Sequence, residues 1–374
     1  MKEKIKIMTI FGTRPEAIKM APVVKVLKED PMIELIVCVS AQHREMLDQV
    51  LKRFSIIPDY DLDIMEENQT LSKITSKILL GLEEVFKVER PNMILVHGDT
   101  TTTLSATLAA FYNGIDIGHV EAGLRSGDLY SPYPEEANRA LTGRIANIHF
   151  SPTDGNVSNL IKENISKTKI IKTGNTVIDA LVNVVKNDYV FKDESLNKID
   201  YKNKKVILLT AHRRENLGEP MENIFKAVKR LILENDDVEL IFPMHLNPKV
   251  RLIARKYLEG NEKIHLIEPL DYEPFANLMN KSYLILTDSG GIQEEAPALG
   301  KPVLVLRTET ERPEAVEAGT VEMVGINEEF IFIKANELIN NSELYQKMSN
   351  AVNPYGDGKA SLRIVDAIKK HYSN

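Results

Sequence analysis

Short apolar runs rich in Ile, Val and Leu recur along this chain, and most are followed by a longer stretch with helical spacing of its apolar residues. This alternation predicts β-α units that assemble into parallel sheets covered by helices. In the first half, the expected strands are Ile5–Ile10, Leu35–Val39, Met93–His97, Ile117–Val120, Ile148–Ser151 and Ile170–Thr173. In the second half, they are Val206–Thr210, Val238–Pro243, Ile264–Ile267, Tyr283–Thr287 and Pro302–Leu306.

Two sets of strands in a chain of 374 residues predict two domains, because one core rarely serves such a length. The segment 186–205 is rich in Lys, Asp and Asn, and we interpret it as a surface connection. We therefore expect an α/β fold of two Rossmann-like, doubly wound parallel-sheet domains facing a cleft. The N-terminal domain should cover 1–185 and the C-terminal domain 186–357. The last amphipathic stretch, within 358–374, fits back on the N-terminal domain or on its neighbour, and the sequence leaves both possibilities open.

Composition narrows the class of function. With 43% hydrophobic and 27% charged residues, the chain matches a soluble globular protein. Its formal net charge of −7 argues against nucleic acid as a partner. The one cysteine, Cys38, excludes an internal disulfide framework and a cysteine-rich metal site. The longest uncharged stretch, Thr100–Ile115, is too short to span a membrane, and we recognise no signal peptide, so we expect a cytoplasmic protein with no membrane partner and no metal.

The functional prediction rests on the strand ends, since open parallel sheets bind ligands beyond the carboxyl ends of their strands. After the first strand, Gly12 permits a tight turn and Arg14 is a candidate anion clamp. Lys19, one helical turn further, either points the same way or is a solvated lysine. Asp99 and Glu121 each follow a strand of the same predicted sheet. Asp99 is also interpretable as the N-cap of the next helix.

Further ionisable groups follow in both halves. Glu135 and Glu136 open a predicted helix, where one of them can serve only to complement the helix dipole. Carboxylates that converge with few local cations repel one another, so at least one pKa should rise, which suits a general acid or base. His212 directly follows a strand beside two arginines, which favours a functional over a structural role.

The clearest signal for a phosphate group is Ser289–Gly291, which lies between a predicted strand and a predicted helix. Two glycines let backbone N–H groups approach an anion, and a diphosphate fits there. Glu295 is placed to accept hydrogen bonds from a ribose diol or is simply a charge in the first helical turn. Arg312 adds a cation after the next strand. The chain has no G-x-G-x-x-G after a strand, no P-loop motif and no H-E-x-x-H, so neither a dehydrogenase nor a P-loop enzyme is supported.

Six segments carry motifs that occur together in one known family. They are GTRPEAIKMAPV (Gly12–Val23), AQHREMLDQVL (Ala41–Leu51), HGDTTTT (His97–Thr103), VEAGLRSGDLYSPYPEEANR (Val120–Arg139), AHRREN (Ala211–Asn216) and DSGGIQEEAP (Asp288–Pro297). In content and order they resemble the non-hydrolysing UDP-N-acetylglucosamine 2-epimerases, over nearly the whole chain. The resemblance implies a GT-B-type fold, a homodimer, and interconversion of UDP-GlcNAc and UDP-ManNAc without a metal or nicotinamide cofactor. In that family, UDP is eliminated to give 2-acetamidoglucal and then added back with C2 inverted.

The resemblance also assigns residue roles. Catalytic roles fall on Asp99, Glu121, Glu135 and His212, the carboxylates as acid–base groups and the histidine as a donor to the departing diphosphate. Asp99, Glu121 and His212 also count among the substrate contacts. The other nucleotide-sugar contacts fall on Arg14, Lys19, Phe275, Ser289, Gly290, Gly291, Glu295 and Arg312. Phe275 either packs near the uracil or is an ordinary buried aromatic, and which carboxylate serves which face of C2 stays open.

Bacterial members of the family bind a second UDP-GlcNAc as an activator, through residues that match Gln42, Arg213 and His245. Two further positions of that site are changed here, to Glu45 and Asn68, so we expect activation by substrate to be weak or different. Three rivals remain: a hydrolysing epimerase that releases ManNAc and UDP, a GT-B glycosyltransferase, and a non-catalytic nucleotide-sugar sensor. The downstream glycan pathway is not indicated by the sequence.

Overall fold

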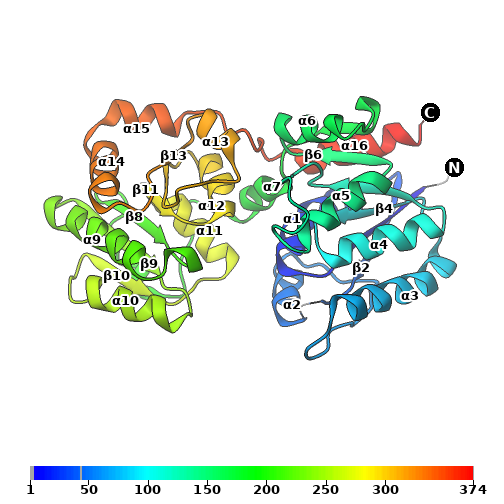
Figure 1. The fold of residues 1–374 in the computed structure, drawn as a ribbon, viewed down its shortest axis with the longest axis horizontal. Helices are drawn as coiled ribbons and strands as arrows, with labels where there is room; N and C mark the ends of the chain where they lie inside the picture. Colours follow the sequence, from blue (N-terminus) through cyan, green and yellow to red (C-terminus); the bar gives the residue numbers. More distant parts are fainter. Residues whose placement is uncertain (1–3, 43, 374) are drawn as a thin grey trace. The chain divides into compact units, whose positions relative to one another are not determined.

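The computed structural model describes residues 4–42 and 44–373. The chain divides into two compact units, Met1–Asn183 together with Tyr355–Asn374, and Val184–Pro354 (Figure 1). Each unit is built on a parallel β-sheet flanked by helices. The predicted α/β class with two doubly wound parallel sheets is therefore confirmed.

The elements of the first unit are β1 (Ile5–Phe11), α1 (Arg14–Glu29), β2 (Ile33–Val39), α2 (Arg44–Arg53), β3 (Tyr60–Asp61), α3 (Leu71–Glu89), β4 (Met93–His97), α4 (Thr101–Tyr112), β5 (Asp116–Val120), α5 (Glu135–Ile145), β6 (Ile148–Ser151), α6 (Asp154–Lys162), β7 (Ile170–Lys172), α7 (Thr176–Val184) and α16 (Ala360–His371). Those of the second unit are α8 (Glu194–Asn197), β8 (Lys205–Thr210), α9 (Glu219–Glu234), β9 (Val238–Pro243), α10 (Pro248–Leu258), β10 (Ile264–Ile267), α11 (Tyr272–Lys281), β11 (Leu284–Thr287), α12 (Gly290–Glu295), β12 (Val303–Val305), α13 (Pro313–Glu317), β13 (Val321–Met323), α14 (Glu328–Asn340) and α15 (Ser342–Ser349).

Both sheets reverse their strand order near the middle. Among the described residues, the first sheet has seven strands in the order β3-β2-β1-β4-β5-β6-β7. The second, described over the same part of the chain, has six in the order β10-β9-β8-β11-β12-β13. The order switches between β1 and β4 in one sheet and between β8 and β11 in the other. A ligand site in such a sheet is expected outside the carboxyl ends of the strands at this switch point.

Local sequence explains why the chain turns sharply at the switch point of the first sheet. The β4 segment MILVH is buried along its whole length, which is typical of a central parallel strand. α1 begins with a capping box between Thr13 and Glu16 and has a proline in its first turn. α4 is capped by Thr100, whose hydroxyl oxygen accepts the backbone N–H of Thr103. Both helices thus begin directly beyond the carboxyl end of a central strand.

The structure differs from the sequence-based expectation in three places. β3 and β13 were not expected, and each is a strand of two or three residues at a sheet edge. The segment 186–205, interpreted as a surface connection, instead packs into the second unit. It forms α8 and buries Phe191, Leu196 and Ile199. These apolar residues are too widely spaced to produce a periodic signal, although burial shows that they are part of a core.

The C-terminal helix α16 belongs to the first unit, and Figure 1 shows it in red among the blue to green elements of that unit. Its first two N–H groups, those of Ala360 and Ser361, donate to the carboxylate of Asp179 at 3.1 and 2.8 Å. Its apolar face buries Ile364 and Ile368. Through the part of the chain that is described, no helix combines the length and apolar character needed to cross a membrane.

Candidate active site

The first cluster of candidate residues surrounds the switch point of the first sheet. Arg14 and Lys19 lie on α1, and Glu121 directly follows β5. The Lys19 Nζ forms an ion pair with Oε2 of Glu121, which also accepts a hydrogen bond of 3.0 Å from the amide of Asn175. His97 Nε2 lies 3.7 Å from the same oxygen. Several groups therefore fix the orientation of the Glu121 carboxylate.

Glu121 also has an unusual backbone. Its φ of 62° places it in the left-handed region, which non-glycine residues rarely adopt. Such strain costs on the order of 1 kcal/mol and is common at functional positions. The left-handed turn takes the chain out of β5 while leaving the side chain within the reach of Lys19.

Asp99 lies just beyond the end of β4, as Glu121 lies beyond the end of β5. The residue that caps α4 is Thr100, so the alternative interpretation of Asp99 as an N-cap is wrong. Its carboxylate instead forms an ion pair of 2.5 Å with Arg139 of α5. Burial raises the pKa of Asp99; Arg139 lowers it and Glu121 raises it, and the net direction is upward. The expectation of a carboxylate with a raised pKa in this cluster is met at Asp99.

The two glutamates that begin α5 have different surroundings. Glu136 is buried and binds Arg139 at 3.0 Å, while its other carboxylate oxygen accepts the backbone N–H of Gly127 at 3.2 Å. Glu135 is half-buried at the first position of the helix. Glu136 is thus the acid engaged inside the protein, and Glu135 is the acid at the helix start.

A further carboxylate, Glu16, holds the loops after β1 and β4 together. One of its oxygens accepts the backbone N–H groups of Gly12 and Thr13, at 3.0 and 2.8 Å. The other accepts the hydroxyl groups of Thr100 and Thr103, at 2.7 and 3.3 Å. Burial raises the pKa of Glu16, against these hydrogen bonds. The sequence analysis missed this role, although the T-x-x-E pattern of a capping box pointed to it.

The second cluster lies at the switch point of the second sheet. His212 follows β8, and its Nδ1 is 3.1 Å from Oδ1 of Asp288, which follows β11. The other oxygen of Asp288 accepts the backbone N–H groups of His212 and Arg213, at 2.8 and 2.9 Å, and the amide of Asn216 at 3.1 Å. Asp288 has no exposed surface; burial raises its pKa, but the His212 ring and the backbone N–H groups of Arg213 and His212 lower it, and the net pKa is below the usual value. Asp288 thus fixes the ring of His212 and the turn that carries it.

The turn formed by Ser289–Gly291 directly follows Asp288 in the sequence. α12 begins at Gly290, with Ser289 as its first flanking residue. A Cβ placed on Gly290 would lie 3.0 Å from the guanidinium of Arg312, so the lack of a side chain lets this cation approach the turn. Arg312 also binds Glu294 at 2.9 Å and Glu311 at 2.8 Å. Gly291 is exposed, and a Cβ placed on it would meet nothing within 4 Å, so the space beside it is open.

The remaining candidates lie near these clusters within their own units. Glu295 ends α12, and Phe275 is half-buried on α11. The His245 ring stacks on His212, with 5.6 Å between centroids and 19° between planes. Gln42, in the first unit, accepts a hydrogen bond of 3.0 Å from the Thr102 hydroxyl. The structure thus brings the predicted residues together as two groups, one in each unit.

Sequence reasoning missed the residues that hold the predicted groups in place: Arg139, Asp288, Glu16 and Asn175. Arg139 stands four residues after Glu135 on one helix, a spacing that places both on the same face. Asp288 follows a strand, the same signal that identified Asp99 and Glu121. The position of Asn175 carries no comparable pattern.

The sequence and the fold of this chain are similar to those of known proteins. The family model described as UDP-N-acetylglucosamine 2-epimerase matches residues 25–369. The UDP-N-acetylglucosamine 2-epimerase of Bacillus subtilis is 57% identical over 370 residues, which cover 99% of this chain and 96% of that protein. The Escherichia coli K12 protein of the same name is 54% identical and covers 98% of this chain and 99% of its own length. The crystal structure of UDP-GlcNAc 2-epimerase from Neisseria meningitidis bound to UDP-GlcNAc has a TM-score of 0.85, with 52% identity and coverage of 98% of this chain and 100% of that chain.

Proposed function

This chain belongs to the UDP-N-acetylglucosamine 2-epimerase family, and from that premise we propose that it interconverts UDP-GlcNAc and UDP-ManNAc by inverting C2. It is accordingly an isomerase. The observation that carries the proposal is the pair Asp99 and Glu121, which follow neighbouring strands at a switch point, each with a cation of its own. Two carboxylates held in this way suit the removal and the return of a proton.

The chemistry of the substrate explains why leaving-group departure comes first. The C2 proton is not adjacent to a carbonyl in the ring and is therefore only weakly acidic. Departure of UDP with the electron pair of the C1–O bond creates an oxocarbenium-like C1, which acidifies this proton. A carboxylate then takes the proton from C2, and the product is 2-acetamidoglucal. In the reverse sense, a UDP oxygen bonds to C1 while an acid delivers a proton to the other face of C2.

We assign the proton transfers to Asp99, Glu121 and Glu135. Inversion needs a proton taken from one face and a proton given to the other, or an intermediate that turns within the site, so more than one acid–base group is required. Arg14 and Lys19, both on α1, contribute positive charge on the same side of the sheet. Lys19 already binds Glu121, so this lysine supports the carboxylate as well as any anion.

Binding of UDP falls to the second unit in this proposal. The backbone N–H groups of Ser289–Gly291 and the guanidinium of Arg312 stabilise the diphosphate as its charge grows. His212 donates to the departing phosphate oxygen, and its orientation is fixed by Asp288. Glu295 accepts from the ribose hydroxyl groups, and Phe275 packs near the uracil. The reaction as proposed consumes no metal or redox cofactor, because the proton and UDP both return to the sugar.

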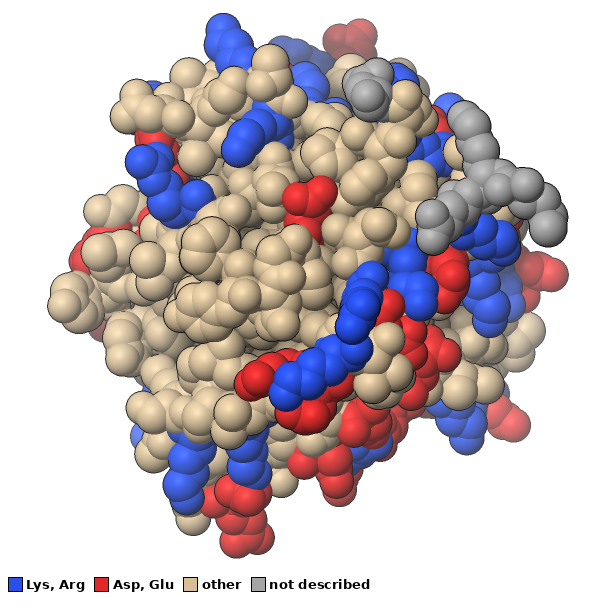
Figure 2. Space-filling view, turned by 90° about the vertical axis from the view of Figure 1, so that its right-hand side faces the viewer, with Lys and Arg blue, Asp and Glu red and all other residues tan. Residues whose placement is uncertain are grey.

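We also propose that the enzyme acts as a homodimer. Figure 2 shows the side of the molecule on which charged side chains surround a broad area that contains few of them. Helix α4 has no Lys, Arg, Asp or Glu and packs between α3 and α5. Large apolar side chains exposed on these three helices are Leu80, Val88, Phe111, Tyr112 and Leu141. Large apolar side chains exposed on neighbouring helices are typical of a protein–protein interface.

Proton NMR in D2O tests the proposed reaction. Purified protein with UDP-GlcNAc, without added metal or nicotinamide, should yield UDP-ManNAc up to a steady ratio, with deuterium at C2 and little free UDP. Accumulation of UDP and free ManNAc would instead identify a hydrolysing epimerase. An unchanged spectrum, both alone and with added UDP as a candidate activator, would overturn the proposal and favour a glycosyltransferase.

A further inference from the structure

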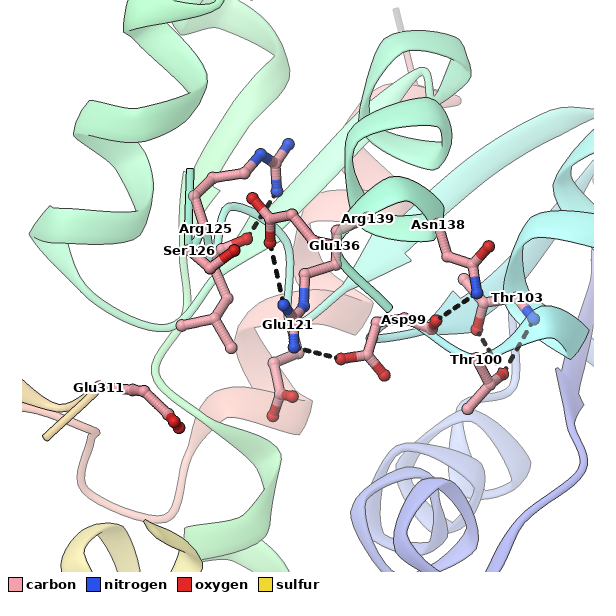
Figure 3. A network of polar contacts seen from close by, with 12 residues as sticks. Asp99, Thr100, Thr103, Glu121, Arg125, Ser126, Glu136, Asn138, Arg139 and Glu311 are labelled. Carbon is pink, nitrogen blue, oxygen red and sulfur yellow. Dashed lines mark hydrogen bonds and ion pairs between the residues drawn. The ribbon is translucent and has the colours of Figure 1, made fainter. Parts of the chain in front are cut away.

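Asp99 is held at two points by one helix. Its backbone carbonyl accepts a hydrogen bond of 2.8 Å from the amide of Asn138, and its carboxylate binds Arg139 at 2.5 Å. Figure 3 shows these two residues of α5 reaching Asp99 side by side. The same helix begins at Glu135. The two contacts therefore fix Asp99 relative to the helix that carries another proposed acid–base residue.

Arg139 is itself tightly constrained. Its side chain is 11% exposed and also binds Glu136, whose side chain is 3% exposed. Glu136 in turn accepts the backbone N–H of Gly127, in the loop between β5 and α5. Figure 3 shows Arg139 between Asp99 and Glu136. A guanidinium is planar, and contacts on both sides fix its orientation, so it presents Asp99 with one donor direction.

We infer that Arg139 is a positioning residue for Asp99: it fixes the carboxylate in one orientation at the end of β4. This inference rests on the proposed function. Arg139 acts through Asp99 and does not take part in the transfer of the proton. A buried ion pair adds little net stability by itself, so the arrangement is better explained by what it does to Asp99.

The charges that face Asp99 define the expected pH dependence. Arg139 approaches from α5, Lys19 from α1 and Glu121 from the end of β5. Burial and Glu121 raise the pKa of Asp99, while Arg139 and Lys19 lower it. Loss of the Arg139 charge removes a lowering influence, so the pKa of Asp99 moves further up. A carboxylate base is active above its pKa, and a carboxylic acid is active below it. In both roles, the limb of the pH profile that reports Asp99 moves to higher pH.

The test compares three variants in both directions of the reaction. Arg139→Gln should lower kcat about 100-fold, because a displaced catalytic group costs about this much, while KM for UDP-GlcNAc stays nearly unchanged. Its pH profile should shift to higher pH. Arg139→Lys restores the charge without the fixed geometry, so its pH limb should return toward the wild-type position while kcat stays reduced. Arg144→Gln is the matched control, since Arg144 is an exposed arginine on the same helix that binds the backbone oxygen of Glu163.

Each outcome bears on the inference. A folded Arg139→Gln protein with wild-type kcat and pH profile overturns it, and so does a rise in KM alone, which would mean that Arg139 contacts the substrate. If Arg139→Gln does not fold, Arg139→Lys decides: an unchanged kcat overturns the inference, and a reduced kcat with a near-normal pH limb supports it. Absence of any conversion by the wild-type protein would contradict the proposed function instead, so the two failures are distinct.

Discussion

At the scale of single residues, Asp288 shows how a buried acid can serve a neighbouring group. It has no exposed surface, yet it binds two backbone N–H groups, one amide and the ring of His212. A carboxylate opposite Nδ1 favours the ring with a proton on that nitrogen. The other ring nitrogen, Nε2, is then the one left for phosphate, to which it donates when it carries a proton.

Asp288→Asn should therefore reduce kcat on the order of 100-fold, the usual cost of losing one preorganised donor to a developing anion. The asparagine oxygen can still accept backbone N–H groups, but the substitution removes the carboxylate oxygen that faces Nδ1 of His212. The measurement is a double-mutant cycle with His212→Asn. If Asp288 acts through His212, the double variant should be no slower than His212→Asn alone. Independent, additive losses would contradict this.

The site residues that were predicted and those that were missed differ in the kind of pattern that identifies them. Asp99 and Glu121 were identified because each follows a strand, which is a local pattern. Arg139 was missed because its importance depends on a partner 40 residues away. Asp288 also follows a strand, so the local pattern could have identified it, but its role depends on a partner 76 residues away. Burial and pairing between distant segments are properties of the folded chain, and a single sequence does not display them.

At the scale of elements, most strands were predictable, and the two that were not are short edge strands. β4, β6 and β9 have the bounds that apolar runs predicted, because buried parallel strands are continuously apolar, and the edge strand β10 also has its predicted bounds. β3 and β13 lie at sheet edges and contain two and three residues, too few for any periodic signal. The caps of α1 and α4 place the functional loops, and the capping box of α1 was present in the sequence as T-x-x-E.

Three neighbouring strands carry buried histidines, which predicts an acid-sensitive fold. Burial lowers the pKa of His97 and His119 to about 4 and that of His149 to about 3, from an ordinary 6.5. The unfolded chain therefore binds more protons below pH 6.5, so stability is complete above that pH and falls as the pH drops toward 4. Each histidine contributes a slope of about 1.4 kcal/mol per pH unit in this window.

His149→Phe provides the measurement. Both ring nitrogens of His149 lack a hydrogen-bond partner among the described residues, so an apolar ring of similar shape should be neutral or stabilising at pH 7. Urea unfolding between pH 7 and pH 4.5 should show a shallower loss of stability than in the wild-type protein. The comparison variant is His371→Phe, which removes an exposed histidine that contacts Asp116 at 3.2 Å, and it should not reproduce the shallower loss. An equally steep loss in His149→Phe would show that this histidine does not carry the effect.

At the scale of the whole molecule, regulation by a second substrate is testable from kinetics. The family resemblance predicts an activator site at Gln42, Arg213 and His245, with Glu45 and Asn68 as changed positions. Both of these are exposed on the first unit. An acidic side chain there opposes binding of a diphosphate. Initial rates plotted against UDP-GlcNAc should be hyperbolic or weakly sigmoidal, and Glu45→Gln should increase any sigmoidality. Strong sigmoidality in the wild-type protein would contradict this expectation.

The proposed homodimer makes a second prediction at this scale. Phe111 and Tyr112, at the end of α4, contact each other. They are 59% and 72% exposed, so much of their apolar surface is available to a second copy of the chain. Burying two such rings against a second copy contributes several kcal/mol at about 25 cal/mol per Å². Phe111→Lys with Tyr112→Lys should therefore shift the protein from dimer to monomer in light scattering, without lowering its secondary-structure content.

Leu252→Lys is the matched control for this experiment, since Leu252 is 73% exposed on α10 of the second unit and is not among the apolar residues of α3, α4 and α5. It should leave the molecular mass unchanged. A wild-type protein that is monomeric at micromolar concentration would contradict the homodimer. A double variant that stays dimeric would instead place the interface elsewhere on the molecule, because two added charges at the centre of an apolar contact cannot be desolvated without a large cost.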